Sequence, residues 1–486
     1  MLTKLLASLI VLPALANSAT LEDSYSSVRF GFNDHLIFSS SKDANDSSLP
    51  PANLLMHENS LKAEFREYTL KIGFSNRLSI SGTSDPNQPF VLEKKSAIAE
   101  WEKWDLKLGD SYQELGRGIA LSLYRNESFG IDNTLEGVSV RYHPEAWELL
   151  LFAGRINALS APVAIHALPN PLIDRRVWIA GTSVNGEIVA MKLGGHYFAA
   201  LNQPLQSSKF DKQWHTGGIT ISKDNLLEGL DLYLESNILY TRLQFGDRQP
   251  PMGLGSYGSL VWANDQWKLK WETKDFRNYH FEFKRPPTLE EDIVETINTD
   301  NVSGTRLFAE HKFSEGKNSV HASYLLGDDR EQQSTLHHGV VGTKWKGPWR
   351  ADIELRTGYR WMPSKLNMAH GLIKGKLPTL KGQSVELTLR KQYSESWLKG
   401  LEDRNILDLT YTFSEKFNAS FGYEYVPFNE APLEKHFLNV AASLKWGALT
   451  SKAFIGQTSG GTLCSGGVCR QVPPYTGAML ETHYSF

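Results

Sequence analysis

Apolar and polar side chains alternate along many stretches of this chain, with the two-residue period of a β-strand. The clearest stretch is residues 350–361, which read RADIELRTGYRW. One face of this predicted strand carries Ala351, Ile353, Leu355, Thr357, Tyr359 and Trp361, and the other carries Arg350, Asp352, Glu354, Arg356 and Arg360. Successive side chains of a strand point to opposite faces, so this strand has one apolar and one polar face. The pattern recurs at 138–143, 407–413 and 419–425 and predicts an all-β protein.

The links between the predicted strands alternate between short and long. Short turns are predicted at 143–146, 185–186, 264–266, 314–318, 345–348, 414–417 and 446–448. Longer polar or Pro/Gly-rich links fall at 156–176, 244–256, 284–304 and 458–474. Outer-membrane barrels have short periplasmic turns and longer extracellular loops, and aromatic girdles near the strand ends. We therefore predict a transmembrane antiparallel β-barrel of about 22 strands, with about 18 as the lower count.

The N-terminal region divides into two parts before the barrel. Residues 1–19 combine a short positive start, an apolar run at 5–16 and small residues at a candidate cleavage site, as a secretory signal peptide does. No later apolar run reaches the roughly 18 residues of a membrane helix. Residues 20–60 have no clean place in the strand pattern, so they are expected to form a periplasmic tail, an extra hairpin or a partial plug, with the barrel at 61–486.

Composition agrees with a barrel. The chain has 13 Trp, 18 Tyr and 23 Phe, yet its mean hydropathy is only −0.34, the combination expected when half of each strand faces lipid and half a polar lumen. A formal net charge of −3 argues against a nucleic-acid partner, which requires a basic excess.

The two cysteines lie close together. Cys464 and Cys469 flank Ser-Gly-Gly-Val, and glycine gives such a small ring the freedom it needs. Export favours oxidation, so a disulfide is expected. A redox-active or metal-binding pair is the alternative, although two thiolates do not complete a zinc site.

Two stretches carry a resemblance to a known family. LGRGIALSLYRNESFGIDNTLEGVSVRYHPEAWELLLFAGR at 115–155 and GGTLCSGGVCRQVPPYTGAML at 460–480 resemble an uncharacterised family of large bacterial outer-membrane barrels, a domain of unknown function with this Cys-x4-Cys element. The C-terminal strand, with Tyr484 and Phe486, also looks like the assembly signal that the outer-membrane insertion machinery recognises. These resemblances imply architecture and location, with no activity attached. They also lead us to expect that Phe486 ends a last strand that closes the barrel beside the first.

Charged residues on the polar faces are the candidate lumen lining. The candidates are Arg117, Arg350, Asp352, Glu354, Arg356 and Arg360, with Lys268, Lys270, Glu272 and Lys274 on another strand. Arg117, Arg125, Asp132 and Arg155 line the lumen, tie a surface loop to the wall by charge-assisted hydrogen bonds, or form structural ion pairs between neighbouring strands.

No enzyme signature is present. The 14 His residues show no nucleophile, base and orienting group at a recognisable spacing, and no cofactor or metal motif occurs. Acidic clusters at 289–295 and 327–331 either bind divalent cations at a lipopolysaccharide surface or are simply solvated loops.

The sequence therefore favours a non-enzymatic protein of the bacterial outer membrane, in contact with its lipid and lipopolysaccharide. We expect a porin-like channel or transporter for small polar solutes. The alternative is a plugged barrel that anchors or docks a periplasmic or surface protein.

Overall fold

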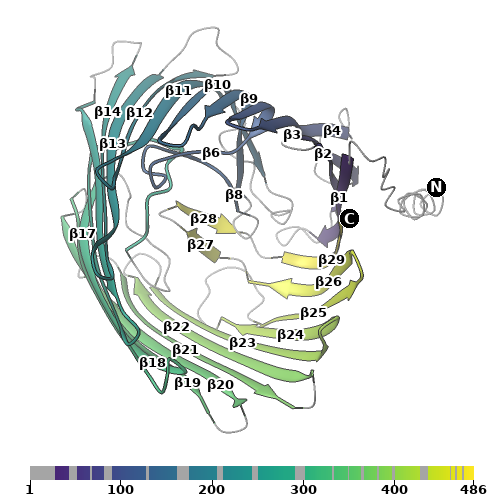
Figure 1. Ribbon diagram of the computed structural model, residues 1–486. Coiled ribbons are helices and arrows are strands. Elements are labelled where there is room, and N and C mark those ends of the chain that lie inside the picture. Colours follow the sequence, from purple (N-terminus) through teal and green to yellow (C-terminus); the bar gives the residue numbers. More distant parts are fainter. Residues whose placement is uncertain are drawn as a thin grey trace.

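The computed structural model describes residues 28–42, 52–65, 68–81, 90–126, 131–160, 175–204, 212–243, 250–289, 301–330, 333–347, 350–362, 366–379, 382–396, 400–426, 436–459, 461–465, 468–472 and 475–485. Within these residues, 24 antiparallel strands form a closed barrel (Figure 1). The wall strands are β1 (Val28–Lys42), β2 (Ala52–Phe65), β3 (Tyr68–Ser81), β4 (Phe90–Trp101), β5 (Trp104–Ser111), β9 (Ile131–Tyr142), β10 (Trp147–Ser160), β11 (Arg175–Ile188), β12 (Met191–Pro204), β13 (Lys212–Leu227), β14 (Leu230–Leu243), β15 (Gly253–Ala263), β16 (Trp267–Arg277), β17 (Val302–Phe313), β18 (Asn318–Asp329), β19 (Ser334–Lys346), β20 (Asp352–Trp361), β21 (Leu366–Pro378), β22 (Ser384–Ser396), β23 (Gly400–Ser414), β24 (Phe417–Tyr425), β25 (His436–Trp446), β26 (Leu449–Thr458) and β29 (Tyr475–Ser485). The remaining strands are β6 (Gln113–Leu115), β7 (Leu121–Leu123), β8 (Arg125–Asn126), β27 (Gly461–Ser465) and β28 (Val468–Val472). In the described part of the chain, no helix is long and apolar enough to cross a membrane.

The first and last wall strands close the ring. β1 pairs with β29 in a register that runs from Asn33 opposite Ser485 to Lys42 opposite Thr476. Closure removes the unpaired strand edges that an open sheet would expose. The expectation that the last strand closes the barrel beside the first is confirmed, although Phe486 itself lies outside the described residues.

The N-terminal segment was assigned wrongly as a tail or plug. β1 and most of β2, which ends at Phe65, come from residues 20–60 and are wall strands, so the hairpin alternative is the one found. Their pattern is hard to read because Asp34 and His57 interrupt the apolar outer face and bond each other there. This hairpin also explains why the observed strand count exceeds the predicted range.

Short and long links alternate around most of the ring, but the prediction fails between β18 and β23. There the successive links 330–333, 347–351, 362–365, 379–383 and 397–399 are all only three to five residues long. One turn was placed wrongly: Asn185 and Gly186 lie inside β11, and the turn is formed by Val189 and Ala190, which adopt positive φ angles of 51° and 59°. Asn-Gly is a strong turn signal, but here the chain turns a few residues later. Parts of the longer links at 156–176, 244–256, 284–304 and 458–474 lie outside the described residues.

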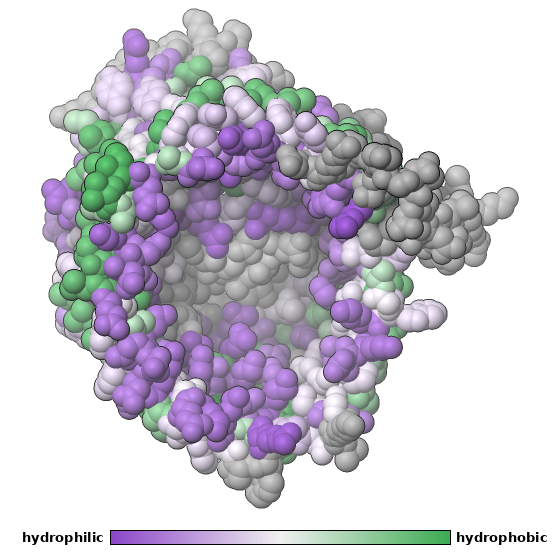
Figure 2. Space-filling model, viewed as in Figure 1, coloured by the Kyte–Doolittle hydropathy of each residue, from purple (hydrophilic) through white to green (hydrophobic). Residues whose placement is uncertain are grey.

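Most of the wall has an apolar outer face and a polar inner face, although β10 to β15 also carry apolar side chains on the inner face. Leu307, Val341 and Tyr359 are more than half exposed on the outside, where a water-soluble protein would cover them. Trp104 and Trp267 begin their strands beside short turns, as members of an aromatic girdle do. Figure 2 shows hydrophobic residues along the outside of the ring and hydrophilic residues around the hollow inside it.

Candidate functional site

The barrel interior is the candidate site, and a segment between β5 and β9 enters it. Residues 112–124 leave the wall, and β6 and β7 pair within them as a small hairpin. The following residues, Arg125 and Asn126, form β8 and pair with β9 in the wall. We call residues 112–126 the lumen hairpin. Its turn contains Gly116 and Gly118, whose φ angles of 62° and 75° lie in the left-handed region that glycine adopts without strain. The glycines of the LGRG sequence therefore serve this turn.

The tip of the lumen hairpin is fixed to the inner face of β14 and β15. The backbone N–H of Arg117 donates to Glu235 Oε2 at 2.8 Å, and its guanidinium donates to Ser259 Oγ at 3.2 Å. The guanidinium also stacks on the Tyr233 ring, 3.8 Å from its centroid. Arg117 remains exposed, so it presents positive charge to the interior. A cation held over an aromatic face in this way has a defined position.

Glu235 organises this contact from a buried position. Besides Arg117, it accepts hydrogen bonds from Tyr233 Oη at 2.6 Å and Asn237 Nδ2 at 2.8 Å. The Gly116 backbone lies so close to the carboxylate that a Cβ there would collide with it. Glycine is therefore required for the tip to reach its anchor.

A second segment, residues 279–289, enters the interior between β16 and β17; we call it the inner segment. It bonds to the lumen hairpin through Ser122 N–H to Phe283 O and Arg285 N–H to Gly118 O, both 2.7 Å. A Cβ at Gly118 would lie 2.7 Å from Arg285 O, closer than real Cβ atoms come. The two segments thus form one unit inside the barrel.

This unit has a hydrophobic core of its own against the inner wall. Its members include Ile119 and Leu121 from the lumen hairpin, Phe281 from the inner segment, and Phe198 and Trp214 from the wall. Phe281 contacts both wall residues, with ring centroids 5.2 Å from Phe198 and 5.7 Å from Trp214. Burying each such side chain contributes roughly 1.5–3 kcal/mol. Apolar residues that face inward on β10 to β15 therefore stabilise the inserted unit.

Charged groups on β2, β4 and β9 hold the base of the lumen hairpin, away from the tip that contacts β14 and β15. Arg125 donates to both carboxylate oxygens of Glu58 on β2, at 2.9 and 2.8 Å. Tyr112 donates to Asp132 at 3.0 Å, and Lys94 bonds the same carboxylate. These charge-assisted contacts are stronger than neutral hydrogen bonds.

The same charged cluster reaches the strands that close the barrel. His35 on β1 approaches Glu58 at 3.5 Å and Glu481 on β29 at 3.1 Å. Lys452 on β26 in turn approaches Glu481 at 3.2 Å. The cluster therefore ties the hairpin base to the closing seam.

Burial raises the pKa of three titratable groups of the lumen hairpin, Tyr112, Glu114 and Tyr124. Burial raises the pKa of the Glu114 carboxyl above its ordinary value; Arg285 opposes this and Glu235 adds to it. Burial, and then the Asp132 carboxylate, raise the pKa of the Tyr112 phenol. Tyr112 therefore stays protonated and keeps donating to Asp132 over the physiological pH range.

The predicted lumen residues differ in where they lie: most are on the inner face or the hairpin tip, and one is in a turn. Arg117 lies at the hairpin tip, and Glu354 and Arg356 lie on the inward face of β20, with Arg360 fully buried on the same face. Asp352 is exposed where β20 begins. Arg350 was misplaced, because it lies in the short turn before β20 with a φ of 60°.

Other predicted charges form ion pairs. Arg155 on β10 pairs with Glu136 on neighbouring β9, as the ion-pair interpretation expects. Arg125 on β8 pairs with Glu58 on β2, which is not a neighbouring strand. On β16, Glu272 and Lys274 are buried, and Lys270 pairs with Glu272 at 2.8 Å. Sequence reasoning missed Glu58 and Glu235, because nothing nearby in the sequence marks their distant partners.

The ends of the chain add two observations. Cys464 and Cys469 lie directly opposite each other in the β27–β28 hairpin. Tyr484 lies near the end of β29, opposite Asp34, and its role as an assembly signal stays a prediction. The described residues contain no group of three or more His, Cys, Asp or Glu that could hold a metal ion.

Comparisons with known proteins agree with the barrel fold. The sequence model of a family of unknown function, DUF6029, matches residues 376–486. The 460–480 stretch falls within this match and the 115–155 stretch does not. No curated protein matches the sequence.

Solved barrels resemble the whole chain at low identity. The siderophore receptor PirA from Pseudomonas aeruginosa is 9% identical, with 94% of this chain and 80% of that chain covered and a TM-score of 0.51. The copper transporter OprC is 11% identical with the same coverage and a TM-score of 0.50. The P pilus usher (PapC) translocation pore is 10% identical, with 94% and 99% covered and a TM-score of 0.47. By its fold the chain is a closed antiparallel β-barrel similar to those of PirA and OprC.

Proposed function

We propose that this protein is a porin-like channel or transporter for small polar solutes in the bacterial outer membrane. The observation that carries the proposal is the lumen hairpin, which is anchored at both ends and occupies part of the barrel interior. Arg117 at its tip is exposed, and its guanidinium is held 3.8 Å from the centroid of the Tyr233 ring, which supports a fixed positive charge that passing solutes would contact. Fixed charge at a constriction biases which solutes pass.

The orientation follows from the links. Short turns face the periplasm in outer-membrane barrels, so both ends of the wall lie on the periplasmic side and the lumen hairpin enters from the extracellular side. We also propose that the outer face of the wall contacts the lipid and lipopolysaccharide of the outer membrane. An additional periplasmic or surface protein partner, export by residues 1–19 and a non-enzymatic role stay predictions.

Solute entry into liposomes tests the proposal. Refolded protein is inserted into vesicles, and swelling is followed with uncharged sugars of increasing size. We expect the smallest sugars to enter and larger ones to be excluded at a size set by the hairpin. Vesicles that hold folded barrel yet stay impermeable to every sugar would favour the docking alternative.

The cysteine hairpin allows a separate proposal. The opposed positions of Cys464 and Cys469 support a disulfide that ties the turn between β27 and β28. We expect alkylation without reduction to leave the mass of the mature protein unchanged, and alkylation after reduction to add two groups. Two groups added without reduction would refute the disulfide.

A further inference from the structure

A tyrosine–histidine pair lies on the outer face of the wall between β18 and β19. Tyr324 Oη lies 2.7 Å from His337 Nδ1, and both side chains face outward. The ring of Trp361 lies 5.2 Å from His337 on its other side. When Tyr324 donates to Nδ1, the ring carries its proton on Nε2, which then points away from the hydrogen bond. This geometry makes His337 an oriented outward donor.

The same arrangement recurs twice among the described residues. Tyr197 Oη lies 2.8 Å from His215 Nδ1 on β12 and β13, and Tyr423 Oη lies 2.8 Å from His436 Nδ1 on β24 and β25. In all three pairs the tyrosine lies six residues after the first residue of its strand. The histidine lies two positions beyond the residue opposite that tyrosine in the register. The three histidines therefore share one height on the wall.

That height is the extracellular edge of the apolar band. Each histidine is paired in the register with the residue that lies eight positions after the first residue of the tyrosine's strand. With the rise of a tilted strand, this is about 20 Å above the short turns, compared with an apolar band of about 25 Å. Side chains at this level meet lipid headgroups.

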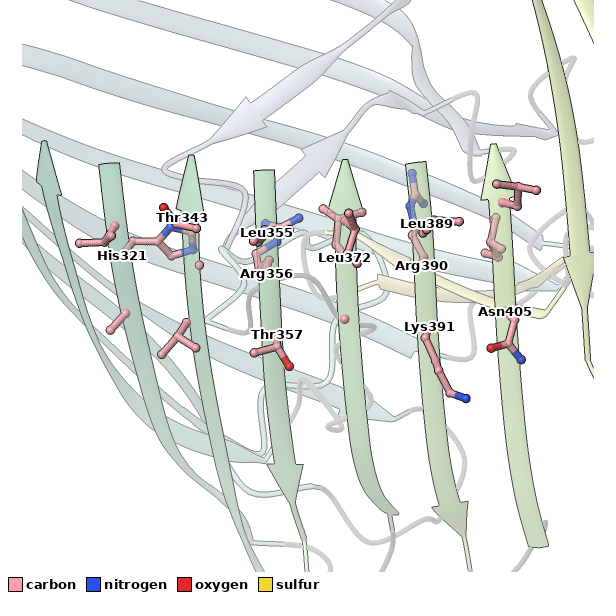
Figure 3. Close-up of a pocket in the computed structure, with 18 of the residues that line it drawn as sticks. His321, Thr343, Leu355, Arg356, Thr357, Leu372, Leu389, Arg390, Lys391 and Asn405 are labelled. Atoms are coloured by element: carbon pink, nitrogen blue, oxygen red, sulfur yellow. The ribbon is translucent and has the colours of Figure 1, made fainter. Parts of the chain in front are cut away.

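An apolar groove begins beside the first pair and extends along the outer wall. It has a volume of about 1010 Å³ and is lined by Leu307, Ala322, Tyr324, Gly339, Val341, Tyr359 and Ala369, among others. Small side chains at Ala322, Gly339 and Ala369 hollow the wall between larger neighbours. A second groove of about 1190 Å³ reaches Tyr423 of another pair, and Figure 3 shows it crossing adjacent strands, with Leu355 and Leu389 among its labelled residues. On the described wall, the His337 N–H donor therefore lies beside a groove large enough for an acyl chain.

We propose that the outer face at His337 is a binding site for a phosphorylated lipid of the outer leaflet, such as lipid A. The phosphate accepts a hydrogen bond from His337 Nε2, and one acyl chain lies in the groove lined by Gly339 and Val341. The His436 pair with its groove forms an equivalent site. This inference rests on the membrane placement in the proposed function, but it does not require that the lumen conducts.

The chemistry favours a phosphate over other headgroup atoms. A phosphate monoester carries up to two negative charges and three acceptor oxygens, which suit a fixed N–H donor. His57 occupies the equivalent height on β2, but Asp34 bonds its ring there, and a carboxylate would repel a phosphate.

Native mass spectrometry of the full mature chain tests the site. Protein refolded in detergent is mixed with bis-phosphorylated lipid A or with the same lipid after removal of its phosphates. We expect bound lipid only with the phosphorylated form. His337→Gln should lower the number of lipid molecules bound per protein by one. The H337Q/H436Q double variant should lower it by two. Tyr324→Phe, which keeps the aromatic ring but frees the histidine tautomer, is expected to weaken binding several-fold.

A matched control and a groove variant complete the test. His143 lies in the short turn after β9, where it contacts Asp105 at 3.3 Å, and it lines neither groove, so H143Q should bind as the unchanged protein does. Gly339→Leu should fill the groove and reduce binding while His337 is intact. Equal binding of both lipids, or no loss in H337Q, would overturn the proposal. Insertion of the protein into vesicles is measured separately. A barrel that inserts but binds both lipids equally refutes the lipid site and leaves the proposed channel function standing.

Discussion

Replacement of residues 113–123 by a short Gly-Ser link is expected to raise the single-channel conductance several-fold. The lumen hairpin and its hydrophobic core occupy part of the interior, so their removal widens the passage. The wall should persist, because β5 pairs directly with β9 from Trp104 opposite Tyr142 to Ser111 opposite Leu135. The conductance of refolded variant and unchanged protein in planar bilayers is the measurement.

Two further variants control this result. Lys103→Ala changes an exposed residue in a short turn and should leave the conductance unchanged. Gly118→Val should raise it partially, because φ is +75° and its Cβ would press on Arg285 O. An unchanged conductance after removal of the hairpin would show that the hairpin does not narrow the passage.

Glu272→Gln is expected to lower the free energy of unfolding by roughly 3–5 kcal/mol, the cost of breaking a buried ion pair. Glu272 is 2% exposed and accepts from Tyr257 Oη at 2.6 Å, from Lys270 and from the Arg306 guanidinium. The amide retains the shape of the side chain but leaves two cations without their counter-charge. Urea unfolding in lipid vesicles gives the difference.

Asp224→Asn is the matched control for this variant. Asp224 pairs with Lys192, and both side chains are more than 60% exposed, at 70% and 62%. Solvent screens exposed ion pairs, so the loss of unfolding free energy should be small. Equal losses in the two variants would contradict a structural role for the Glu272 cluster.

The wall could be predicted from the sequence because the alternation of apolar and polar residues along a strand shows which side chains face outward and which face inward. Leu355 and Tyr359 alternate with Arg356 and Arg360, and the structure has the first two on the outside and the last two inside. The pattern fails where an outward position is polar. Asp34 on β1 breaks the alternation, which hid the first hairpin and lowered the strand count.

The inserted unit could not be predicted in the same way. Residues 279–283 alternate like a strand but lie in the interior, because their apolar partners come from other strands. The contact between Arg117 and Glu235 joins residues separated by 118 positions, and no local pattern records it. The candidate site is therefore a property of the tertiary fold.

The central claim is that solutes pass the tip of the lumen hairpin through the barrel interior. The most direct measurement is the single-channel current of an Arg117→Cys variant in a planar bilayer before and after addition of a bulky thiol reagent. Leu326→Cys, on the outer face, serves as the control. The account predicts a steady current that falls in one step for R117C and does not change for the control. A current that is absent from folded barrels, or unaffected by modification at position 117, would contradict it.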